Sequence, residues 1–226
     1  MTVAPGGPRR KTIPRSARCR TIGPRPYPRT RIGQRRNAAG QQRQVNPLPV
    51  EFRTERLFLR PWRAGDAADL KPILDANAVH LRRWIPAHVA ESAPLPELER
   101  RLEGFADDFR AGRNFRYAIL TAPANGLCGE VSLFPRSATD RVALAAADRM
   151  EIGYWLRSDL TGRGYATEAA KAMLQLASSL PGISQVEIRC DPANGASAAV
   201  PRRLGFSLLP PETESLMLWA YTVPAG

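Results

Sequence analysis

The stretch Glu151–Leu174, EIGYWLRSDLTGRGYATEAAKAML, decides the fold of this chain. It begins with a predicted strand, Ile152–Leu156, continues through a turn with two glycines, Gly162 and Gly164, and passes directly into a helix. One face of that helix carries small and apolar side chains at helical spacing: Ala166, Ala169, Ala170, Met173, Leu174 and Ala177. Its alanines let the helix lie close to a sheet, and Pro181–Gly182 ends it.

A glycine turn at the start of a helix is a potential anion site. The first backbone N–H groups of a helix lack partners within it, and the helix dipole adds roughly half a positive charge there. Gly162 and Gly164 remove the Cβ atoms that would hold a diphosphate away from the backbone. The turn is neither a Walker loop nor a G-x-G-x-x-G fingerprint. By spacing alone, it predicts either a phosphate cradle or a tight turn without a ligand.

Strands and helices alternate through the chain from Glu51 onward. The predicted strands are Phe52–Arg60, Phe115–Thr121, Leu127–Phe134, Met150–Arg157, Val186–Cys190 and Ser215–Thr222. The predicted helices are Asp66–Ala76, Val79–Trp84, Leu95–Arg110, Tyr165–Leu180 and Gly195–Leu204, and the predicted turn between the second and third strands is Pro123–Gly126. This order predicts a mixed sheet flanked by helices, of the α/β or α+β class.

The N-terminal residues differ in composition from the rest. Residues 1–50 contain 12 of the 33 Lys and Arg residues and no Asp or Glu, so the remaining 21 basic and 21 acidic residues leave the body formally neutral. Residues 1–49, rich in Arg and Pro and without periodicity, are predicted to be a disordered tail, and residues 50–226 one domain.

Three interpretations of the basic tail remain open. Its arginines can bind nucleic acid or an anionic surface, although only Tyr27 is available for base stacking. The tail can also be solvated without a partner. Alternatively, it results from a start codon placed too far upstream, with the native protein beginning near Val45–Val50.

Composition also excludes several classes of protein. No apolar run approaches the ~20 residues that cross a bilayer, and the basic start lacks the apolar region of a secretory signal. The three cysteines, Cys19, Cys128 and Cys190, are widely spaced, and the histidines are His80 and His88. This pattern suits a reducing cytoplasm and predicts neither a disulfide framework nor a metal site.

Four blocks of the body resemble one family. Thr161–Ala166 is similar to the pyrophosphate loop R/Q-x-x-G-x-G/A of the GNAT superfamily of N-acetyltransferases, with Thr161 in place of Arg or Gln. Glu151–Leu156, Thr54–Trp62 and Asn194–Phe206 resemble blocks of its RimJ/RimL-type branch, which includes ribosomal-protein alanine acetyltransferases. The resemblance covers the whole body and none of the tail.

The resemblance implies a mostly antiparallel mixed sheet in which two splayed parallel strands, Glu151–Arg157 and Val186–Cys190, hold acetyl-CoA. The diphosphate would lie on Gly162–Ala166, the pantetheine would pair near Trp155–Arg157, and backbone N–H groups near Trp155–Leu156 would receive the thioester oxygen. The implied cofactor contacts are Trp155, Leu156, Arg157, Thr161, Gly162, Arg163, Gly164, Tyr165, Ala166, Asn194 and Ser197. No metal is implied.

Acetyl transfer to an amine needs a neutral amine, which directs attention to strand carboxylates. Glu187 matches a strand glutamate that is the base in some relatives, and Glu151 shares a strand face with Trp155. Each can equally be a carboxylate paired with an arginine. Glu130 is a third strand glutamate, weaker as a base and assigned to substrate binding.

The departing thiolate benefits from a proton donor. Ser197 matches the serine of RimL-type enzymes that acts toward the CoA sulfur, although it can also be an ordinary first-turn helix residue. Asn194 suits both an N-cap and a cofactor contact. Pro201 occupies the position at which another GNAT branch carries a tyrosine acid, so that acid is excluded here.

The acceptor is predicted from the cost of deprotonation. At pH 7 an α-amine with a pKa of ~7.8 needs about 1 kcal/mol to become neutral, whereas a lysine at ~10.4 needs roughly 4.6 kcal/mol. This difference favours a protein N-terminus or a small amine, and the resemblance implies a ribosomal protein among the candidate acceptors. Trp84 is assigned to the acceptor pocket, with a core position as the alternative. The rival from another class is an inert acyl-CoA-binding module that uses the tail as a nucleic-acid or ribosome anchor.

Overall fold

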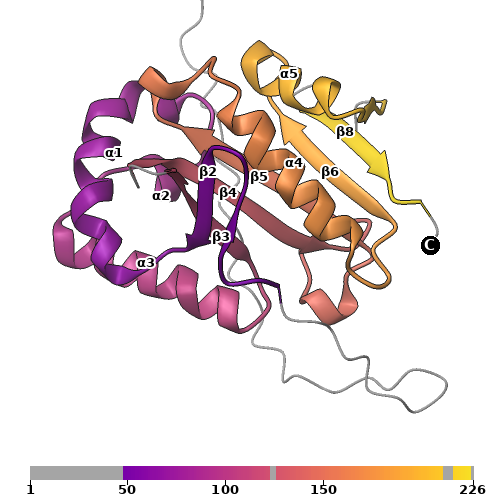
Figure 1. The fold of residues 1–226 in the computed structure, drawn as a ribbon, viewed down its shortest axis with the longest axis horizontal. Helices are drawn as coiled ribbons and strands as arrows, with labels where there is room; N and C mark the ends of the chain where they lie inside the picture. Colours follow the sequence, from indigo (N-terminus) through magenta and orange to yellow (C-terminus); the bar gives the residue numbers. More distant parts are fainter. Residues whose placement is uncertain (1–47, 123–125, 211–215, 225–226) are drawn as a thin grey trace, which may run out of the picture. The chain divides into compact units, whose positions relative to one another are not determined.

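The computed structural model describes residues 48–122, 126–210 and 216–224 (Figure 1). The strands are β1 (Phe52–Arg53), β2 (Leu57–Pro61), β3 (Phe115–Thr121), β4 (Leu127–Arg136), β5 (Arg149–Leu156), β6 (Gln185–Cys190), β7 (Ser207–Leu208) and β8 (Met217–Thr222). The helices are α1 (Ala67–Arg82), α2 (Ala87–Ala90), α3 (Leu95–Arg110), α4 (Tyr165–Ser178) and α5 (Gly195–Arg203), with 3-10 turns η1 (Ala64–Asp66), η2 (Leu144–Ala146) and η3 (Ser158–Leu160).

The strands form one eight-stranded sheet in the order β1-β2-β3-β4-β5-β6-β8-β7. Among the described strands, only β5 and β6 pair in parallel, and every other neighbouring pair is antiparallel. The predicted mixed, mostly antiparallel sheet flanked by helices is therefore confirmed.

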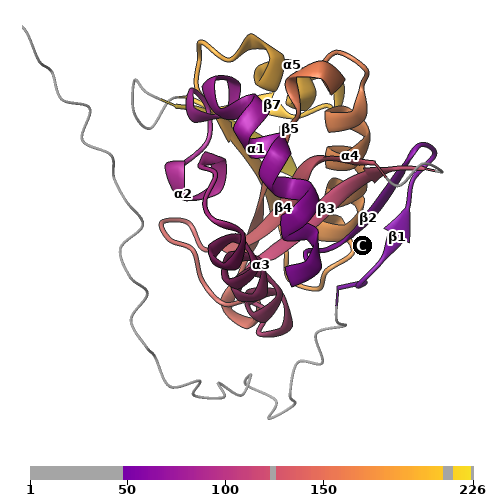
Figure 2. The ribbon, with the colours of Figure 1, turned by 90° about the vertical axis from the view of Figure 1, so that its left-hand side faces the viewer.

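Each face of the sheet has its own hydrophobic core. On one face, Ile152 of β5 packs with Ala169 and Met173 of α4 in a cluster that also includes residues of α5. On the other face, Trp155 of β5 belongs to a cluster with Leu74 of α1 and residues of α3. Figure 2 shows α4 and α3 on opposite sides of the sheet. Ile152 and Trp155 thus point to opposite faces of the sheet and belong to different cores, because side chains alternate along a strand.

The parallel pair separates part-way along its length. The Cα partners are Arg149–Gln185, Met150–Val186 and Glu151–Glu187. Beyond this point β5 continues to Leu156 on β4, while β6 continues to Cys190 on β8. The separation creates the V-shaped gap between the two strands that the sequence predicts.

The predicted single strand Phe52–Arg60 is wrong, because its residues form the hairpin β1–β2. Its turn is closed by Thr54, whose N–H donates to the Leu57 carbonyl (2.9 Å) and whose hydroxyl accepts from the Leu57 N–H (3.0 Å). Strand alternation alone does not reveal this turn, since the threonine side chain competes locally for backbone hydrogen bonds.

The predicted helices Asp66–Ala76 and Val79–Trp84 are also wrong as separate elements. They form one helix, α1, because Leu74 and Leu81 keep its buried face continuous. Asn77, between the two predicted ranges, is buried in mid-helix, and its amide donates to the Ile73 carbonyl (2.9 Å).

The folded body begins before the predicted boundary at residue 50. Leu48 is buried in the core, and the Tyr117 hydroxyl donates to the Pro49 carbonyl (2.9 Å). The rest of the predicted tail and most of the predicted Pro123–Gly126 turn lie outside the described residues. In the described ranges, no helix is long and apolar enough to span a bilayer.

Candidate functional site

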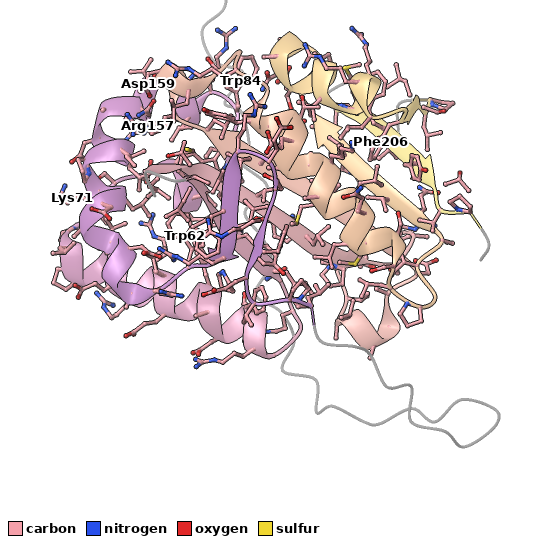
Figure 3. All side chains as sticks on the ribbon, viewed as in Figure 1. Trp62, Lys71, Trp84, Arg157, Asp159 and Phe206 are labelled. Carbon is pink, nitrogen blue, oxygen red and sulfur yellow. The ribbon has the colours of Figure 1, made fainter. Side chains whose placement is uncertain are left out.

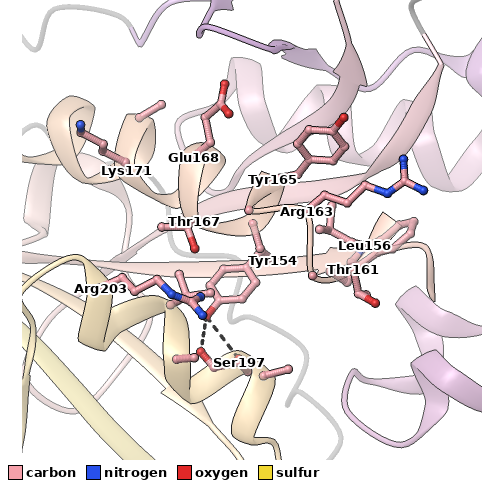
Figure 4. A pocket seen from close by; sticks show the side chains of 18 of the residues that line it. Tyr154, Leu156, Thr161, Arg163, Tyr165, Thr167, Glu168, Lys171, Ser197 and Arg203 are labelled. Carbon is pink, nitrogen blue, oxygen red and sulfur yellow. Dashed lines mark hydrogen bonds between the residues drawn. The ribbon is translucent and has the colours of Figure 1, made fainter. Parts of the chain in front are cut away.

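A groove of about 1460 Å³ runs along the start of α4 and the end of β5. Its other walls come from the β1–β2 hairpin, the last turn of α1 and the first turns of α5. All but one of the predicted cofactor contacts line it, namely Trp155, Leu156, Thr161, Gly162, Arg163, Gly164, Tyr165, Ala166, Asn194 and Ser197. Figure 4 shows several of these side chains around the space.

The glycine turn exposes the N-terminus of α4 to this groove. Gly162 and Gly164 have positive φ angles of 74° and 81°, a left-handed conformation that glycine adopts without steric cost. Gly164 is the N-cap, and it has no side chain that could accept a hydrogen bond from the backbone N–H groups of the first turn. The Glu168 N–H donates to the Gly164 carbonyl (3.0 Å), so the N–H groups of the three preceding residues point out of the helix end.

A Cβ atom on either glycine would change this cradle. At Gly164 it would lie 3.3 Å from Nη2 of Arg56, while at Gly162 it would enter space with no heavy atom within 4 Å. Both glycines therefore keep the backbone open on the groove side. Arg163, Lys171 and Arg203 bring positive charge to the same groove. Converging backbone N–H groups and cations are what a diphosphate ester requires.

Glu168 ties the β1–β2 hairpin to the first turn of α4. Its carboxylate accepts hydrogen bonds from the Thr54 hydroxyl, the Arg56 N–H (2.8 Å) and the Arg56 Nε (2.7 Å). Nη1 of Arg56 in turn donates to the Arg163 carbonyl (3.0 Å) in the glycine turn. We call Thr54, Arg56 and Glu168 the latch.

The latch also affects the pKa values of Glu168 and Arg56, which lie beside the glycine turn. Burial favours a higher pKa for Glu168, but the hydrogen bonds from Thr54 and Arg56 outweigh it and lower the pKa below its ordinary value. The hydrogen bond to Glu168 raises the pKa of Arg56. The carboxylate is thus held ionised and paired, which limits its repulsion of a phosphate nearby. The sequence prediction missed this role of Arg56, because Thr54 and Arg56 lie more than 100 residues from Glu168.

Asn194 caps α5, since its Oδ1 accepts from the Ser197 N–H (3.0 Å). The Ser197 hydroxyl donates to the hydroxyl of Tyr154 (3.2 Å), which itself donates to the Ser197 carbonyl (2.9 Å). Figure 4 shows this pair across the gap between β5 and α5. Burial raises the pKa of Tyr154, so its hydroxyl stays protonated. Sequence reasoning missed Tyr154, although alternation along β5 places it on the α4 face.

None of the three strand glutamates lines the groove. Glu151 and Glu187 are Cα partners at the point where β5 and β6 part, on the face opposite α4. Glu187 is fully buried: its Oε1 accepts from Arg149 (3.0 Å) and Gln185 (2.9 Å), and its Oε2 from Arg189 (2.6 Å).

Glu151 is held less completely. Its Oε2 accepts from Arg136 (2.8 Å) and Arg189 (3.1 Å), whereas its Oε1 has Nη2 of Arg141 at 3.7 Å, beyond hydrogen-bond length. Among the described residues, one oxygen of Glu151 therefore has no hydrogen-bond donor, whereas both oxygens of Glu187 accept hydrogen bonds.

Glu130, assigned to substrate binding, lies in the core. Its Oε2 accepts from the Trp62 Nε1 (2.7 Å), and its Oε1 accepts from Arg116 Nη1 (2.6 Å) and the Ser132 hydroxyl (3.0 Å). With 5% of its side chain exposed, it has no access to a substrate. The placement argues for a structural carboxylate.

Arg157 is the one predicted cofactor contact that does not line the groove. Its guanidinium donates to Asp159 (2.8 and 3.0 Å), beside which it lies in Figure 3, and its backbone N–H donates to the Cys128 carbonyl (2.8 Å). The N–H is therefore engaged and cannot pair with a pantetheine chain. Trp84, by contrast, lines the groove.

Residues 56–207 match the family described as "Acetyltransferase (GNAT) domain". The chain belongs to this family. The matched segment contains the glycine turn, the separating strands and the start of α5. The GNAT fold and the use of acetyl-CoA as co-substrate follow from this membership, and the open cradle fits the phosphates of that molecule. Among the described residues, no cluster of His, Cys, Asp and Glu could hold a metal ion.

The names of two similar proteins refer to the ribosome. YdaF of Bacillus subtilis (strain 168), whose name marks it as a candidate ribosomal N-acetyltransferase, is 28% identical over 158 residues, which cover 67% of this chain and 78% of YdaF. A solved structure of RimL, a ribosomal L7/L12 α-N-protein acetyltransferase in complex with coenzyme A, has a TM-score of 0.63 at 21% identity, covering 80% of this chain and 98% of RimL.

A second solved structure is closer in sequence. RimJ of Mycobacterium smegmatis, in complex with a CoA-disulfide, has a TM-score of 0.60 at 26% identity and covers 74% of this chain and 81% of RimJ. These comparisons support an N-acetyltransferase of RimJ/RimL type.

Proposed function

We propose that this GNAT enzyme transfers the acetyl group of acetyl-CoA to the α-amine of a protein N-terminus in the cytoplasm. One observation carries the acceptor class: among the described residues, both oxygens of Glu187 accept hydrogen bonds, and only one oxygen of Glu151 lacks a donor. A site with so little basic capacity suits an amine that is easily neutralised. An α-amine at pKa ~7.8 needs about 1 kcal/mol at pH 7, several kcal/mol less than a lysine.

In the proposed reaction the neutral amine attacks the thioester carbon. The new N–C bond forms as the C–S bond breaks, and the sulfur leaves with the bonding electron pair. The amine proton passes to water, and Glu151, which does not line the groove, is reached only through water. The Ser197 hydroxyl, which lines the groove, passes a proton to the thiolate once it turns away from Tyr154, and it is reprotonated by water at the same time.

A ribosomal protein is the acceptor that the named relatives favour, since the names of YdaF and RimL refer to ribosomal substrates. We include this acceptor in the proposal. A small metabolite amine and an inert acyl-CoA-binding module are the competing outcomes of the experiment below.

The experiment pairs two peptides of equal length. One has a free α-amine and no lysine, and the other has a blocked N-terminus and one lysine. Release of CoA thiol should be faster with the first peptide by about two orders of magnitude at pH 7, as the difference in amine neutralisation predicts. Faster release with the lysine peptide would reject the α-amine, and acetyl-CoA binding without any thiol release would reject the enzyme.

A further inference from the structure

A layer of charged side chains covers the sheet where β5 and β6 part, on the face opposite α4. Glu151 and Glu187 lie at its centre, paired with arginines from β4, β5 and β6. The arginines of this layer are Arg116, Arg136, Arg141, Arg149 and Arg189, and its glutamates are Glu130, Glu151 and Glu187. None of these arginines has a side chain more than 36% exposed.

The layer is continuous and carries excess positive charge. Phe134 connects its two halves, because the guanidinium of Arg116 lies 5.2 Å and that of Arg141 lies 4.0 Å from the centre of its ring. Five arginines face three glutamates, and the layer stays positive when Asp148, half exposed at its edge beside Arg149, is included. Removing unbalanced charge from water is costly, so such a layer favours an anionic partner.

Arg141 is the arginine with the fewest partners. Its one ion pair is Glu151 at 3.7 Å, and 36% of its side chain is exposed. Stacking on Phe134 fixes the plane of the guanidinium. The edges of a stacked guanidinium remain available for two parallel hydrogen bonds to a carboxylate. Arg141 is thus built to hold an anion close to the free oxygen of Glu151.

The charge extends to helix α2, next to the acceptor side of the groove. His88 has a lowered pKa, caused first by partial burial and then by the charges of Arg116, Arg101 and Arg141, which outweigh the opposite effect of Glu130. The field around α2 is therefore positive despite the glutamate. Trp84 and Ile85, which line the groove, immediately precede this helix.

We infer that the acceptor is an acidic N-terminal peptide, whose carboxylates bind the arginine layer with Arg141 as the principal contact. The inference rests on the proposed function and specifies its substrate. An extended peptide advances ~3.5 Å per residue, so carboxylates on the first three residues after the amine stay within about 10 Å of it. That span joins the free oxygen of Glu151 to Arg141 and the arginines beside it.

The test compares two peptides that begin with alanine, one followed by three glutamates and the other by three glutamines. Wild-type enzyme should have a KM for the acidic peptide about tenfold lower. Arg141→Gln should remove most of this preference by raising the KM of the acidic peptide, with acetyl-CoA affinity unchanged. Arg110→Gln, an equal loss of charge at an exposed position of α3, is the matched control and should keep the preference.

Charge reversal provides an independent arm. Arg141→Glu should lower the KM for a third peptide, with three arginines after the alanine, by about fivefold relative to wild type. Equal KM values of wild type for the acidic and neutral peptides, or an undiminished preference in Arg141→Gln, would overturn the inference.

Peptide binding separates this inference from the proposed function. Binding of the labelled acidic peptide to the CoA-saturated protein is measured by anisotropy, which needs no turnover. If no peptide is acetylated but the acidic peptide binds wild type about tenfold tighter than Arg141→Gln, the arginine layer is a peptide site and the proposed reaction fails alone. Equal affinities of the two proteins would reject the layer as the site.

Discussion

At the scale of single residues, the two glycines at the start of α4 form the proposed cofactor site. The sequence predicts them as gaps that let phosphate approach, and their φ angles of 74° and 81° add a second requirement. A residue with a Cβ atom would be strained in this left-handed conformation even without a ligand. Glycine is therefore favoured at both positions for two reasons: the left-handed backbone conformation, and the approach of a phosphate to the backbone.

Gly164→Val should weaken acetyl-CoA binding at least tenfold. The valine would strain the N-cap of α4, and its Cβ would lie 3.3 Å from Nη2 of Arg56. Calorimetric titration measures the affinity. Gly104→Ala is the control, because a Cβ at this helical position meets nothing within 4 Å, and its affinity should equal that of wild type. Unchanged affinity of folded Gly164→Val would place the phosphates elsewhere.

Ser197→Ala should lower kcat by about two orders of magnitude with little change in acetyl-CoA affinity, because a proton donor acts on the transition state. Tyr154→Phe removes the acceptor of the Ser197 hydroxyl but leaves that hydroxyl in place. It should therefore retain more activity than Ser197→Ala. Steady-state rates and calorimetry check both variants, and a loss of affinity in Ser197→Ala without loss of kcat would assign the serine to binding alone.

At the scale of elements, the latch between the β1–β2 hairpin and α4 holds the glycine turn in place. The hairpin exists because Thr54 closes its turn, and the same hydroxyl donates to Glu168. Arg56 then reaches across to the Arg163 carbonyl (3.0 Å). The N-terminal block of the sequence thus acts on a loop more than 100 residues away.

Arg56→Ala should raise the KM for acetyl-CoA about tenfold and leave kcat nearly unchanged, since the latch positions the cradle and does not touch the reacting atoms. Arg56→Lys should recover only part of the affinity, because one ammonium cannot replace the forked contacts. Arg63→Ala is the control, as its exposed ion pair with Glu51 lies outside the groove. An equal fall in kcat would indicate a role in the chemical step.

The latch should also stabilise the fold in a pH-dependent way. The pKa of Glu168 is lower in the folded protein than its ordinary value of 4.5, so its stabilisation is complete above that value and is lost as the pH falls through the folded pKa. Glu168→Gln should be less stable than wild type by about 2 kcal/mol at neutral pH, and this difference should shrink at acidic pH. Urea unfolding at several pH values measures it, with exposed Glu103→Gln as the control. A difference that does not change with pH would contradict the account.

At the scale of the whole molecule, buried polar contacts connect neighbouring strands under helices α1 and α3. Trp62 and Glu130 are 68 residues apart in sequence, yet they share a hydrogen bond of 2.7 Å within the core. Arg116 completes the cluster, and its guanidinium lies 4.5 Å from the centre of the Phe105 ring of α3. The Glu130 carboxylate thus helps to fix how helices α1 and α3 pack on the sheet.

Glu130→Ala should destabilise the protein by about 3 kcal/mol, because it leaves the Arg116 guanidinium buried and without its carboxylate. Thermal unfolding measures the loss. Below the transition, the KM for the neutral peptide, with three glutamines after the alanine, should equal that of wild type. A large rise in that KM without a change in stability would restore the substrate-binding role predicted from the sequence.

The sequence by itself determined the family, the order of most elements and the glycine turn that opens the N-terminus of α4. These features depend on local physics: helical and strand periodicity, glycine at a left-handed turn, and unpaired N–H groups at a helix end. Asn194 as the N-cap of α5 belongs here too, since its bond to Ser197 spans three residues.

Only the tertiary structure decided which polar side chains are free and which are engaged. In the sequence, Glu130, Glu151 and Glu187 are equivalent strand glutamates, and Arg157 is as plausible a cofactor contact as its neighbours. Their separate roles depend on arginines, a tryptophan and carbonyl groups supplied by other strands. A carboxylate's capacity to accept a proton depends on these partners, and strand pairing across the sheet brings them together.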